Sequence, residues 1–338
     1  MTKKKKVIHL PYNVGNQSFN ISRGERKLGF DSDTMEFIPS QWNYSTDYCL
    51  KLQDMGKYRN LFTRTKFLVY SLLKYDIFHF YYADTFFLNM MDLKILKKFG
   101  KKIFFTFQGC DLRLDHSRAF RMCNQCAMTC RDADAVKKLN KLKLILKYAD
   151  ETFCLNPDLM EFSPSSKFLP YASCDVESIN PVDLKIPNDK PLRIMHTPSD
   201  RLKKGTPFLI NAVENLKKRG FEIELVLVEN VTNAEVFEIG KTCHLVCDQL
   251  LAGWYGGFSV EMMALGLPVI AFVEEEQIIK SGLKDIPIIR TDSEIIESTL
   301  EEILKNKESL PEIGKCSREY ALRIHSPVNV AKIITQFY

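Results

Sequence analysis

Residues 255–270 read YGGFSVEMMALGLPVI, and this stretch decides which fold the chain is expected to have. The pattern predicts a helix from Ser259 to Leu265 that ends at Gly266, a residue type common just after helices. Pro268 to Phe272 then form a short apolar run, which predicts a buried strand. A helix that leads directly into a buried strand is a repeating unit of α/β folds.

The same stretch carries candidate ligand-binding residues. Gly256 and Gly257 precede the helix, where glycine lets backbone N–H groups approach a ligand and the helix N-terminus favours a diphosphate. Glu261 lies in the first turn, and its carboxylate can accept hydrogen bonds from vicinal hydroxyls, such as those of a ribose. An ordinary loop followed by a glutamate that satisfies the helix dipole would give the same pattern.

The α/β pattern extends over the whole chain. Apolar runs predict strands at residues 7–10, 77–81, 103–107, 152–155, 192–196, 222–228 and 242–246. Helical patterns cover residues 18–28, 86–99, 207–219, a stretch from 233, then 293–306, 311–324 and 327–338. Strands that alternate with helices imply parallel sheets covered on both faces, with ligands at the carboxyl ends of the strands. With two such halves, the natural site is the cleft between them.

Composition fits a soluble protein of two domains. The chain has 338 residues, of which 45% are hydrophobic and 26% charged. The net charge is +5, from 47 Lys and Arg against 42 Asp and Glu, which fits an anionic ligand or an anionic membrane surface. No basic stripe interleaved with aromatic residues is present, so nucleic acid is not an expected partner.

Targeting signals are weak in this sequence. Lys3 to Lys6 resemble the start of a signal peptide, but the apolar run Val7 to Leu10 is too short to complete one. No stretch approaches the roughly 18 apolar residues of a membrane span. We therefore expect a cytoplasmic protein, at most peripheral to the inner face of the membrane. The lysines are either a solvated flank of the first strand or a lipid-binding patch.

A basic loop follows the strand at residues 192–196. Residues 196–206 read HTPSDRLKKGT, and they open the next predicted helix. Arg201 and Lys204 at the mouth of a cleft would suit a diphosphate, whose charge they can stabilise as it leaves. An ordinary basic loop would look the same.

Together the two segments resemble the nucleotide-binding signature of GT-B glycosyltransferases of the large family four, also called glycosyltransferases group 1. That signature has a Phe-Gly pair, a Glu, a short Ala-Met-Ala-like run and Gly-x-Pro-Val, and this chain has EMMALGLPV at 261–269. The resemblance implies that Glu261 holds the ribose of a nucleotide-sugar, while Arg201 and Lys204 clamp its diphosphate. The likeness is strongest over residues 192–272.

The first half resembles the same family more loosely. Its similar segments are residues 16–29, YDIFH at 75–79, FQGCDLR at 107–113, residues 148–159 and residues 169–171. The implied fold is GT-B: two Rossmann-like domains that face each other across a cleft, with a C-terminal helix returning to the first. The expected boundaries are an acceptor-side domain at 1–180, a linker at 181–191, a sugar-nucleotide-binding domain at 192–322 and the returning helix at 323–338.

The resemblance and the local patterns give a set of candidate site residues. The candidate catalytic residues are Asp111, Arg201 and Lys204. The candidate donor-binding residues are Gly15, Asn16, Gln108, Arg113, Asp248, Gln249, Tyr255, Gly256, Gly257, Phe258, Ser259 and Glu261. No catalytic metal is expected, and a UDP-sugar is the expected donor.

Two positions depart from the family pattern. Many members have a second Glu eight residues before the ribose Glu, facing the donor sugar, and this chain has Gly253 there. The His of a His-Gly motif is Gln108, which cannot act as a general base but can donate a hydrogen bond. A retaining transferase needs few protein acids or bases. An inverting one needs a base, for which Asp111 is the first candidate.

A cysteine cluster raises a separate possibility. Cys123, Cys126 and Cys130 fit a structural zinc site, with Cys110, His116 or Cys154 as the fourth ligand. Their spacing also fits free thiols along one face of a helix. Disulfides are not expected in a cytoplasmic protein.

The sequence thus predicts a transferase that moves a sugar from a nucleotide to a glycan or polyprenyl-linked acceptor, with a retaining mechanism, in surface polysaccharide or glycoconjugate assembly. One alternative is a catalytically weak, nucleotide-binding partner subunit, which the changes at Gly253 and Gln108 keep open. The other is a GT-B type sugar-nucleotide epimerase or hydrolase, which the pair Arg201 and Lys204 would also suit.

Overall fold

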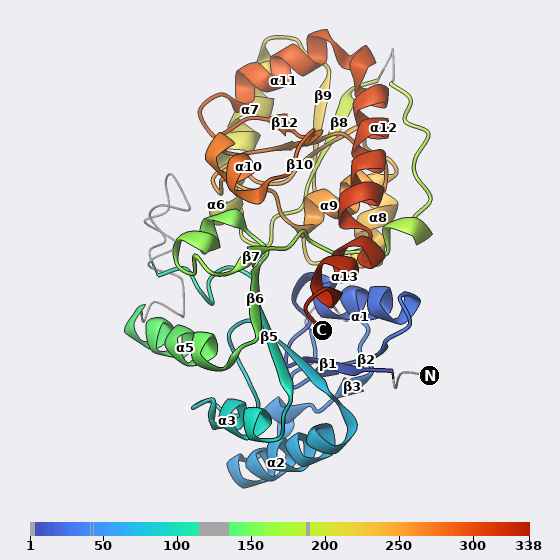
Figure 1. The fold of residues 1–338 in the computed structure, drawn as a ribbon. Coiled ribbons are helices and arrows are strands. Elements are labelled where there is room, and N and C mark those ends of the chain that lie inside the picture. Colours follow the sequence, from blue (N-terminus) through green and yellow to red (C-terminus); the bar gives the residue numbers. More distant parts are fainter. Residues whose placement is uncertain (1–3, 41, 43, 115–134, 187–189) are drawn as a thin grey trace. The chain divides into compact units, whose positions relative to one another are not determined.

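The computed structural model describes residues 4–40, 42, 44–114, 135–186 and 190–338. The described chain forms two compact units (Figure 1). Unit 1 contains residues 4–114, 135–172 and 326–338, and unit 2 contains residues 173–325. None of the helices in the described ranges is long and apolar enough to span a bilayer.

Unit 1 is built on a seven-stranded parallel sheet with the order β3-β2-β1-β4-β5-β6-β7. Its strands are β1 (Lys6–Leu10), β2 (Asp31–Glu36), β3 (Tyr48–Cys49), β4 (Ile77–Tyr81), β5 (Lys102–Phe107), β6 (Glu151–Cys154) and β7 (Lys167–Phe168). The central strands β4 and β5 are apolar almost throughout, because helices bury both of their faces.

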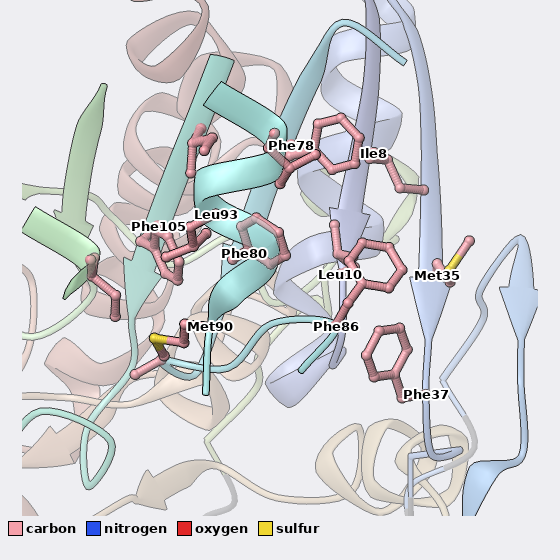
Figure 2. Close-up of a cluster of buried hydrophobic side chains, with 14 of the residues drawn as sticks. Ile8, Leu10, Met35, Phe37, Phe78, Phe80, Phe86, Met90, Leu93 and Phe105 are labelled. Carbon is pink, nitrogen blue, oxygen red and sulfur yellow. The ribbon is translucent and has the colours of Figure 1, made fainter. Parts of the chain in front are cut away.

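Helices of unit 1 lie on opposite faces of this sheet. They are α1 (Gln17–Lys27), α2 (Lys57–Lys74), α3 (Met91–Lys98), α5 (Ala135–Tyr148) and α13 (Pro327–Thr335). One buried cluster joins Phe78, Phe80 and Phe105 of the sheet to α2, α3 and α5. Figure 2 shows these phenylalanines together with Leu93 of α3. A second cluster, on the other face, includes Ile21 of α1 and Val330 of α13. The two sides of the sheet therefore have separate cores.

The last helix completes unit 1, as the sequence predicted. It packs closely on α1: a Cβ added to Gly24 would lie 2.2 Å from the carbonyl oxygen of Pro327. Beyond the helix, the hydroxyl of Tyr338 donates to Glu25, whose other oxygen lies 2.8 Å from Nε2 of His9 in β1. The final residues are thus part of the buried structure of unit 1.

Unit 2 has a five-stranded parallel sheet with the order β12-β11-β10-β8-β9. Its strands are β8 (Leu192–His196), β9 (Ile223–Leu227), β10 (Leu245–Cys247), β11 (Val269–Ala271) and β12 (Ile289–Arg290). Its helices are α6 (Arg201–Lys204), α7 (Thr206–Lys218), α8 (Asn233–Gly240), α9 (Gly257–Ala264), α10 (Glu275–Ser281), α11 (Ile296–Lys305) and α12 (Leu310–Tyr320). The first strand, β8, is an internal strand of the sheet; the chain adds β9 at the edge beside it and then builds β10, β11 and β12 on its other side.

Short helical turns complete the two units. The 3₁₀ turns are Val14–Asn16, Leu52–Asp54, Pro157–Glu161, Val176–Ser178 and Lys307–Ser309, and Ala321–His325 is a π-helical turn.

Several element bounds differ from the sequence expectation. The helix expected at 86–99 begins only at Met91, because the carboxylate of Asp92 accepts hydrogen bonds from Thr85 Oγ1 and Phe86 N and fixes the preceding residues in a loop. The strand expected at 242–246 is β10, which begins at Leu245, since Cys243 closes a turn on the Gly240 carbonyl at 2.9 Å.

Candidate functional site

The candidate donor site of unit 2 lies at the point in its sheet where the strand order reverses. β8 and β10 are neighbours, yet the chain leaves them toward opposite edges of the sheet, and ligands of α/β proteins bind at such switch points. His196 ends β8 and contacts the carbonyl of Cys247, the last residue of β10, through Nδ1 at 2.8 Å. Its Nε2 lies 2.8 Å from Thr206 Oγ1. Burial lowers the pKa of His196, so this residue is a neutral structural link between the strand ends.

The basic loop after β8 begins with a capped helix. The side chain of Asp200 accepts hydrogen bonds from the amides of Leu202 and Lys203 and thereby fixes α6. Gly205 then ends α6 in a left-handed conformation with φ of 78°. A Cβ there would also lie 2.9 Å from that of Leu250. Glycine is therefore required for the backbone to turn from α6 directly into α7 beside the loop that follows β10.

Lys204 turns from this loop toward the end of β10. Its Nζ lies 2.7 Å from Asp248 Oδ1 and 3.1 Å from Gln249 Oε1. The two segments that resemble the family signature are therefore joined by a direct ion pair, although 44 residues separate Lys204 from Asp248.

Asp248 connects this amine to the start of α9. It is 1% exposed, and its Oδ2 accepts hydrogen bonds from Gly256 N at 2.9 Å and Ser259 Oγ at 2.7 Å. Burial by itself would raise the pKa of Asp248, but the charge of Lys204 and these hydrogen bonds outweigh it and lower the pKa. The carboxylate therefore stays ionised and holds Lys204 at the N-terminus of α9.

Two glycines allow the start of α9 to lie against the Lys204–Asp248 ion pair. A Cβ on Gly256 would lie 3.2 Å from Asp248 Oδ2 and 3.7 Å from Lys204 Nζ. A Cβ on Gly257 would lie only 2.5 Å from Ser173 Oγ. The glycine pair thus brings the backbone of the helix start against the ion pair, while the neighbouring Phe258 is half-buried.

Glu261 lies one turn further along α9. It is 6% exposed, and its Oε1 accepts a hydrogen bond from Asn233 Nδ2 at 3.2 Å. Burial, supported by the negative charge of Asp248, raises the pKa of Glu261 to about 8. The carboxyl group is therefore largely protonated near neutral pH, and a ligand with two hydroxyl donors would stabilise its ionised form.

Arg201 and Tyr255 have surroundings that differ from those of Lys204. Arg201 is at the surface and makes a two-pronged contact with Glu229, with Nε 2.9 Å from Oε1. Tyr255 is fully buried, stacks on Trp254, and has its hydroxyl 3.1 Å from Nε2 of His325. In this structure Tyr255 is part of the core of unit 2 and presents no surface to a ligand.

One acidic residue was missed by sequence reasoning. Gly253 stands where the resembled family has a Glu, and a Cβ at this position would lie 2.4 Å from Oε2 of Glu274. The amide of Glu274 also donates to the Gly253 carbonyl at 3.1 Å. The Glu274 carboxylate therefore occupies the space into which a side chain at 253 would grow. The only sequence signal was the run of three glutamates at 274–276, directly after the strand predicted at 268–272.

In unit 1, the candidate residues lie at the carboxyl end of β5. The carboxylate of Asp111 accepts hydrogen bonds from Gly109 N at 2.7 Å and Gln108 N at 3.1 Å. Burial raises the pKa of Asp111 to about 6. The side-chain amide of Gln108 is buried and has no hydrogen-bond partner within the described part of the chain. Burial therefore deprives this amide of hydrogen bonds to water, and a bound ligand could supply hydrogen bonds in their place.

Arg113 has a structural contact in this unit. It forms a bidentate pair with Asp158, with distances of 2.6 and 3.1 Å, and is 9% exposed. Burial would lower the pKa of Arg113, but the Asp158 carboxylate raises it, so the guanidinium stays charged. The pair ties the loop after β5 to the turn after β6.

The remaining candidates of unit 1 lie elsewhere. Gly15 and Asn16 both adopt left-handed φ values, 59° and 57°, directly before α1. Cys110 is half-buried in the loop after β5, whereas Cys123, Cys126 and Cys130 lie outside the described residues. No group of three or more His, Cys, Asp or Glu residues suited to a metal ion occurs within the described residues.

Two parallel, helix-covered sheets whose candidate residues gather at the strand ends define the GT-B class of fold. Among solved structures, the sucrose-phosphate synthase from Thermosynechococcus elongatus aligns over 99% of this chain and 98% of its own, with 15% identity and a TM-score of 0.67. S. aureus MnaA, solved with UDP, aligns over 98% of this chain and 95% of its own, with 13% identity and a TM-score of 0.53.

The glycotransferase of kitacinnamycin matches over 100% of both chains, with 12% identity and a TM-score of 0.53. The sequence matches no protein-family profile and no curated protein. These likenesses identify the fold of the chain.

Proposed function

We propose that this protein is a glycosyltransferase that takes a sugar from a nucleotide-sugar. The observation that carries the proposal is the assembly of Lys204, Asp248 and the glycine-led start of α9 at the switch point of the unit 2 sheet. A cation and a helix N-terminus at one place form an anion site, and a diphosphate is the anion that fits both. Glu261, one turn away, supplies the acceptor for ribose hydroxyls.

Each residue then has a role in the reaction. The bond between the anomeric carbon and the diphosphate oxygen breaks, and the acceptor oxygen forms the new bond to that carbon. Lys204 and Arg201 stabilise the negative charge that the departing diphosphate gains. Arg201 reaches the diphosphate by leaving its surface pair with Glu229, which is an exposed contact of low energetic cost.

A retaining mechanism accounts best for the surroundings of Asp111. Its carboxylate already accepts hydrogen bonds from the backbone amides of Gln108 and Gly109. Asp111 therefore stabilises the turn that contains Gln108 and is not a free base. In the retaining reaction the departing phosphate accepts the proton of the acceptor hydroxyl, and no protein base is needed. The Gln108 amide, which has no hydrogen-bond partner among the described residues, then donates or accepts a hydrogen bond to the sugar.

We infer that Glu274 replaces the carboxylate that Gly253 lacks. The resembled family places an acid at position 253 to face the donor sugar, and here the Glu274 carboxylate fills that space. It is half-buried and follows β11, the neighbour of β10, so it lies at the same carboxyl edge of the sheet as Asp248. Hydroxyl groups of the donor sugar would be its natural hydrogen-bond partners.

The wider setting of the proposal follows the resemblance. The donor is a UDP-sugar, consistent with the UDP in the MnaA structure, and the acceptor is a glycan or a polyprenyl-linked sugar. The reaction belongs to surface polysaccharide or glycoconjugate assembly, in the cytoplasm or at the inner face of the membrane.

A donor screen tests the proposal. The full-length protein is incubated with UDP-, GDP- and dTDP-sugars and a mixture of glycan and lipid-linked acceptors, and products are identified by mass spectrometry. Transfer of a sugar that is lost in Lys204→Ala would support the assignment. Nucleotide binding without turnover would instead indicate a partner subunit, and free or epimerised sugar without transfer would indicate a hydrolase or epimerase.

A further inference from the structure

Three helices of unit 1 form a surface that the candidate site does not use. α2, α3 and α5 lie on one face of the sheet, because Leu68, Leu93 and Leu142 from the three helices belong to a single buried cluster. Their outward sides therefore all point away from the same face of the sheet, and Figure 1 shows α2 and α3 on that side, at the bottom of the view. We call these outward sides, with the adjoining Leu88 and Phe99, the α2–α5 face.

The α2–α5 face is unusually apolar. Among the described residues, 19 large apolar side chains are exposed, and 13 of them lie between residues 58 and 146. They are Tyr58, Leu61, Phe62, Val69, Tyr70, Leu73, Leu88, Met91, Phe99, Val136, Leu139, Leu144 and Leu146. Tyr58 is 88% exposed and Leu73 85%. Such a concentration of exposed apolar side chains marks an interaction site on most soluble proteins.

Its charge has one sign. The exposed charged residues of the three helices are Lys57, Arg59, Lys66, Lys94, Lys98, Lys137, Lys143 and Lys147. The sequences of α2 and α5 contain no acidic residue, and the single one in α3, Asp92, is buried beneath the face. The cations therefore face outward without acidic neighbours on these helices.

The combination of exposed apolar and cationic side chains indicates what kind of partner binds the α2–α5 face. A second copy of the chain would set these cations against an identical cationic surface, which like-charge repulsion opposes. A neutral apolar partner would leave the cations uncompensated. An anionic lipid bilayer offers both complements at once, because its headgroups pair with lysine and arginine while its acyl region receives leucine, phenylalanine and tyrosine side chains.

A groove within the face has the same dual character. It measures about 330 Å³ and lies between Leu88–Met90 and α5. Leu88, Val136 and Leu144 provide apolar walls, and Lys137 and Lys141 stand among the lining residues. One hydrocarbon chain fits such a groove, with its anionic headgroup near the lysines.

We propose that the α2–α5 face docks the protein onto an anionic membrane surface. This deepens the proposed function, because it assigns the membrane contact to named residues, and it brings the enzyme to a lipid-linked acceptor. The binding itself involves neither the donor site nor transfer, so it can be measured separately from both.

Vesicle sedimentation with the full-length protein tests the proposal. One set of vesicles contains phosphatidylcholine alone, and the other contains phosphatidylcholine and phosphatidylglycerol at a ratio of about three to one. Arg59→Glu/Lys66→Glu should weaken binding to the anionic vesicles by about 25-fold or more, on the basis of about fivefold for each cation lost. Phe62→Ser/Leu73→Ser should also weaken it, while wild-type binding should fall as salt is raised.

Matched control variants lie in unit 2. Ile279→Ser removes an apolar side chain of 73% exposure, and Lys218→Glu reverses an exposed charge on α7, and neither should alter binding. Circular dichroism confirms that each variant is folded.

Equal binding of wild-type and α2–α5 variants to anionic vesicles would overturn the proposal. Failure of the wild type to bind any vesicle would overturn it too, and concentration-dependent self-association abolished by the same variants would reassign the face to a second copy. Because none of these readouts includes donor or acceptor, loss of vesicle binding and loss of transferase activity are independent results.

Discussion

The amine of Lys204 lies 2.7 Å from the carboxylate of Asp248, which in turn accepts the backbone N–H of Gly256 at 2.9 Å. One buried anion therefore holds both the cation and the helix start that together define the candidate diphosphate site. Because the side chain of Asp248 is completely buried, we expect this relationship to affect stability as well as donor binding.

Lys204→Ala should affect both properties. It leaves the Asp248 carboxylate buried without its cation, so we expect the free energy of unfolding to fall by about 3 kcal/mol. Donor affinity should fall at least about tenfold, since a charge-assisted contact to the diphosphate is lost. Urea denaturation and calorimetric titration with a UDP-sugar measure the two effects. Lys203→Ala is the matched control, because Lys203 forms a partly exposed 3.5 Å pair with Asp200 and not with the buried Asp248, and equal effects of both variants would contradict the assignment.

Donor binding should depend on pH through Glu261. Its pKa of about 8 in the free protein lies above the ordinary value of 4.5, so the folded protein holds a proton that the unfolded chain releases in this range. The contribution of this group to stability is therefore full at low pH and is lost as the pH rises from about 4.5 to about 8.

Ribose hydroxyls that donate to the ionised carboxylate bind the form that predominates above the pKa. Affinity for a UDP-sugar should then increase by up to about tenfold per pH unit as the pH approaches 8 from below. A UDP-sugar is the suitable probe because its diphosphate diester does not titrate in this range. Glu261→Gln should bind weakly and without this dependence, and an unchanged pH profile in that variant would refute the ribose contact.

A carboxylate exchange tests Glu274. Glu274→Ala should lower kcat by about ten- to a hundredfold with little change in UDP affinity, because the lost contact is to the sugar. Gly253→Glu introduced into that variant should restore part of the activity, since the new side chain grows into the vacated space. Glu276→Ala, which removes an exposed neighbour, is the control. Full activity in Glu274→Ala would remove Glu274 from the mechanism.

Gly24→Ala should destabilise unit 1 strongly. The new Cβ would lie 2.2 Å from the Pro327 carbonyl and would force α13 away from α1, at a cost of about 2 kcal/mol or more. Gly56→Ala is the control, because a Cβ there meets no atom within 4 Å and the φ of −63° suits alanine. Thermal denaturation compares the two, and similar melting temperatures would show that the close contact of α1 and α13 is not required.

The cysteine cluster gives a prediction that depends on sequence alone. If Cys123, Cys126 and Cys130 hold a structural zinc ion, elemental analysis of protein purified without chelators should find about one equivalent of zinc. Cys126→Ser should abolish it, and Cys316→Ser, at an exposed thiol of α12, should not. Less than about a tenth of an equivalent in the wild type would end the zinc hypothesis.

Local patterns predicted the elements of the candidate donor site well. β8 runs from Leu192 to His196 as the apolar run indicated, and α9 begins within two residues of the expected position. In both segments an apolar run is bounded by glycine, proline or a capping residue, so the local signal agrees with the final structure.

Other features could not be predicted because they depend on the three-dimensional arrangement of strands or on apolar side chains that remain exposed. The sequence did not predict α2, because its exposed side also carries Leu61, Phe62, Val69 and Leu73. The helix therefore lacks the division into one apolar and one polar face that marks an ordinary surface helix. Glu274 could not be linked to Gly253 because only the folding of β10 and β11 side by side brings them together.

The contact of α1 with α13 has a consequence for synthesis on the ribosome. Ile21 and Val330 belong to one buried cluster of unit 1, yet about 300 residues of chain lie between them, including all of unit 2. That side of the unit 1 sheet therefore has α1 but lacks the cover of α13 throughout translation of unit 2, and its core is completed only after Val330 and Ile334 have left the exit tunnel. Nascent chains arrested before Pro327 should accordingly depend on chaperones far more than the finished protein does.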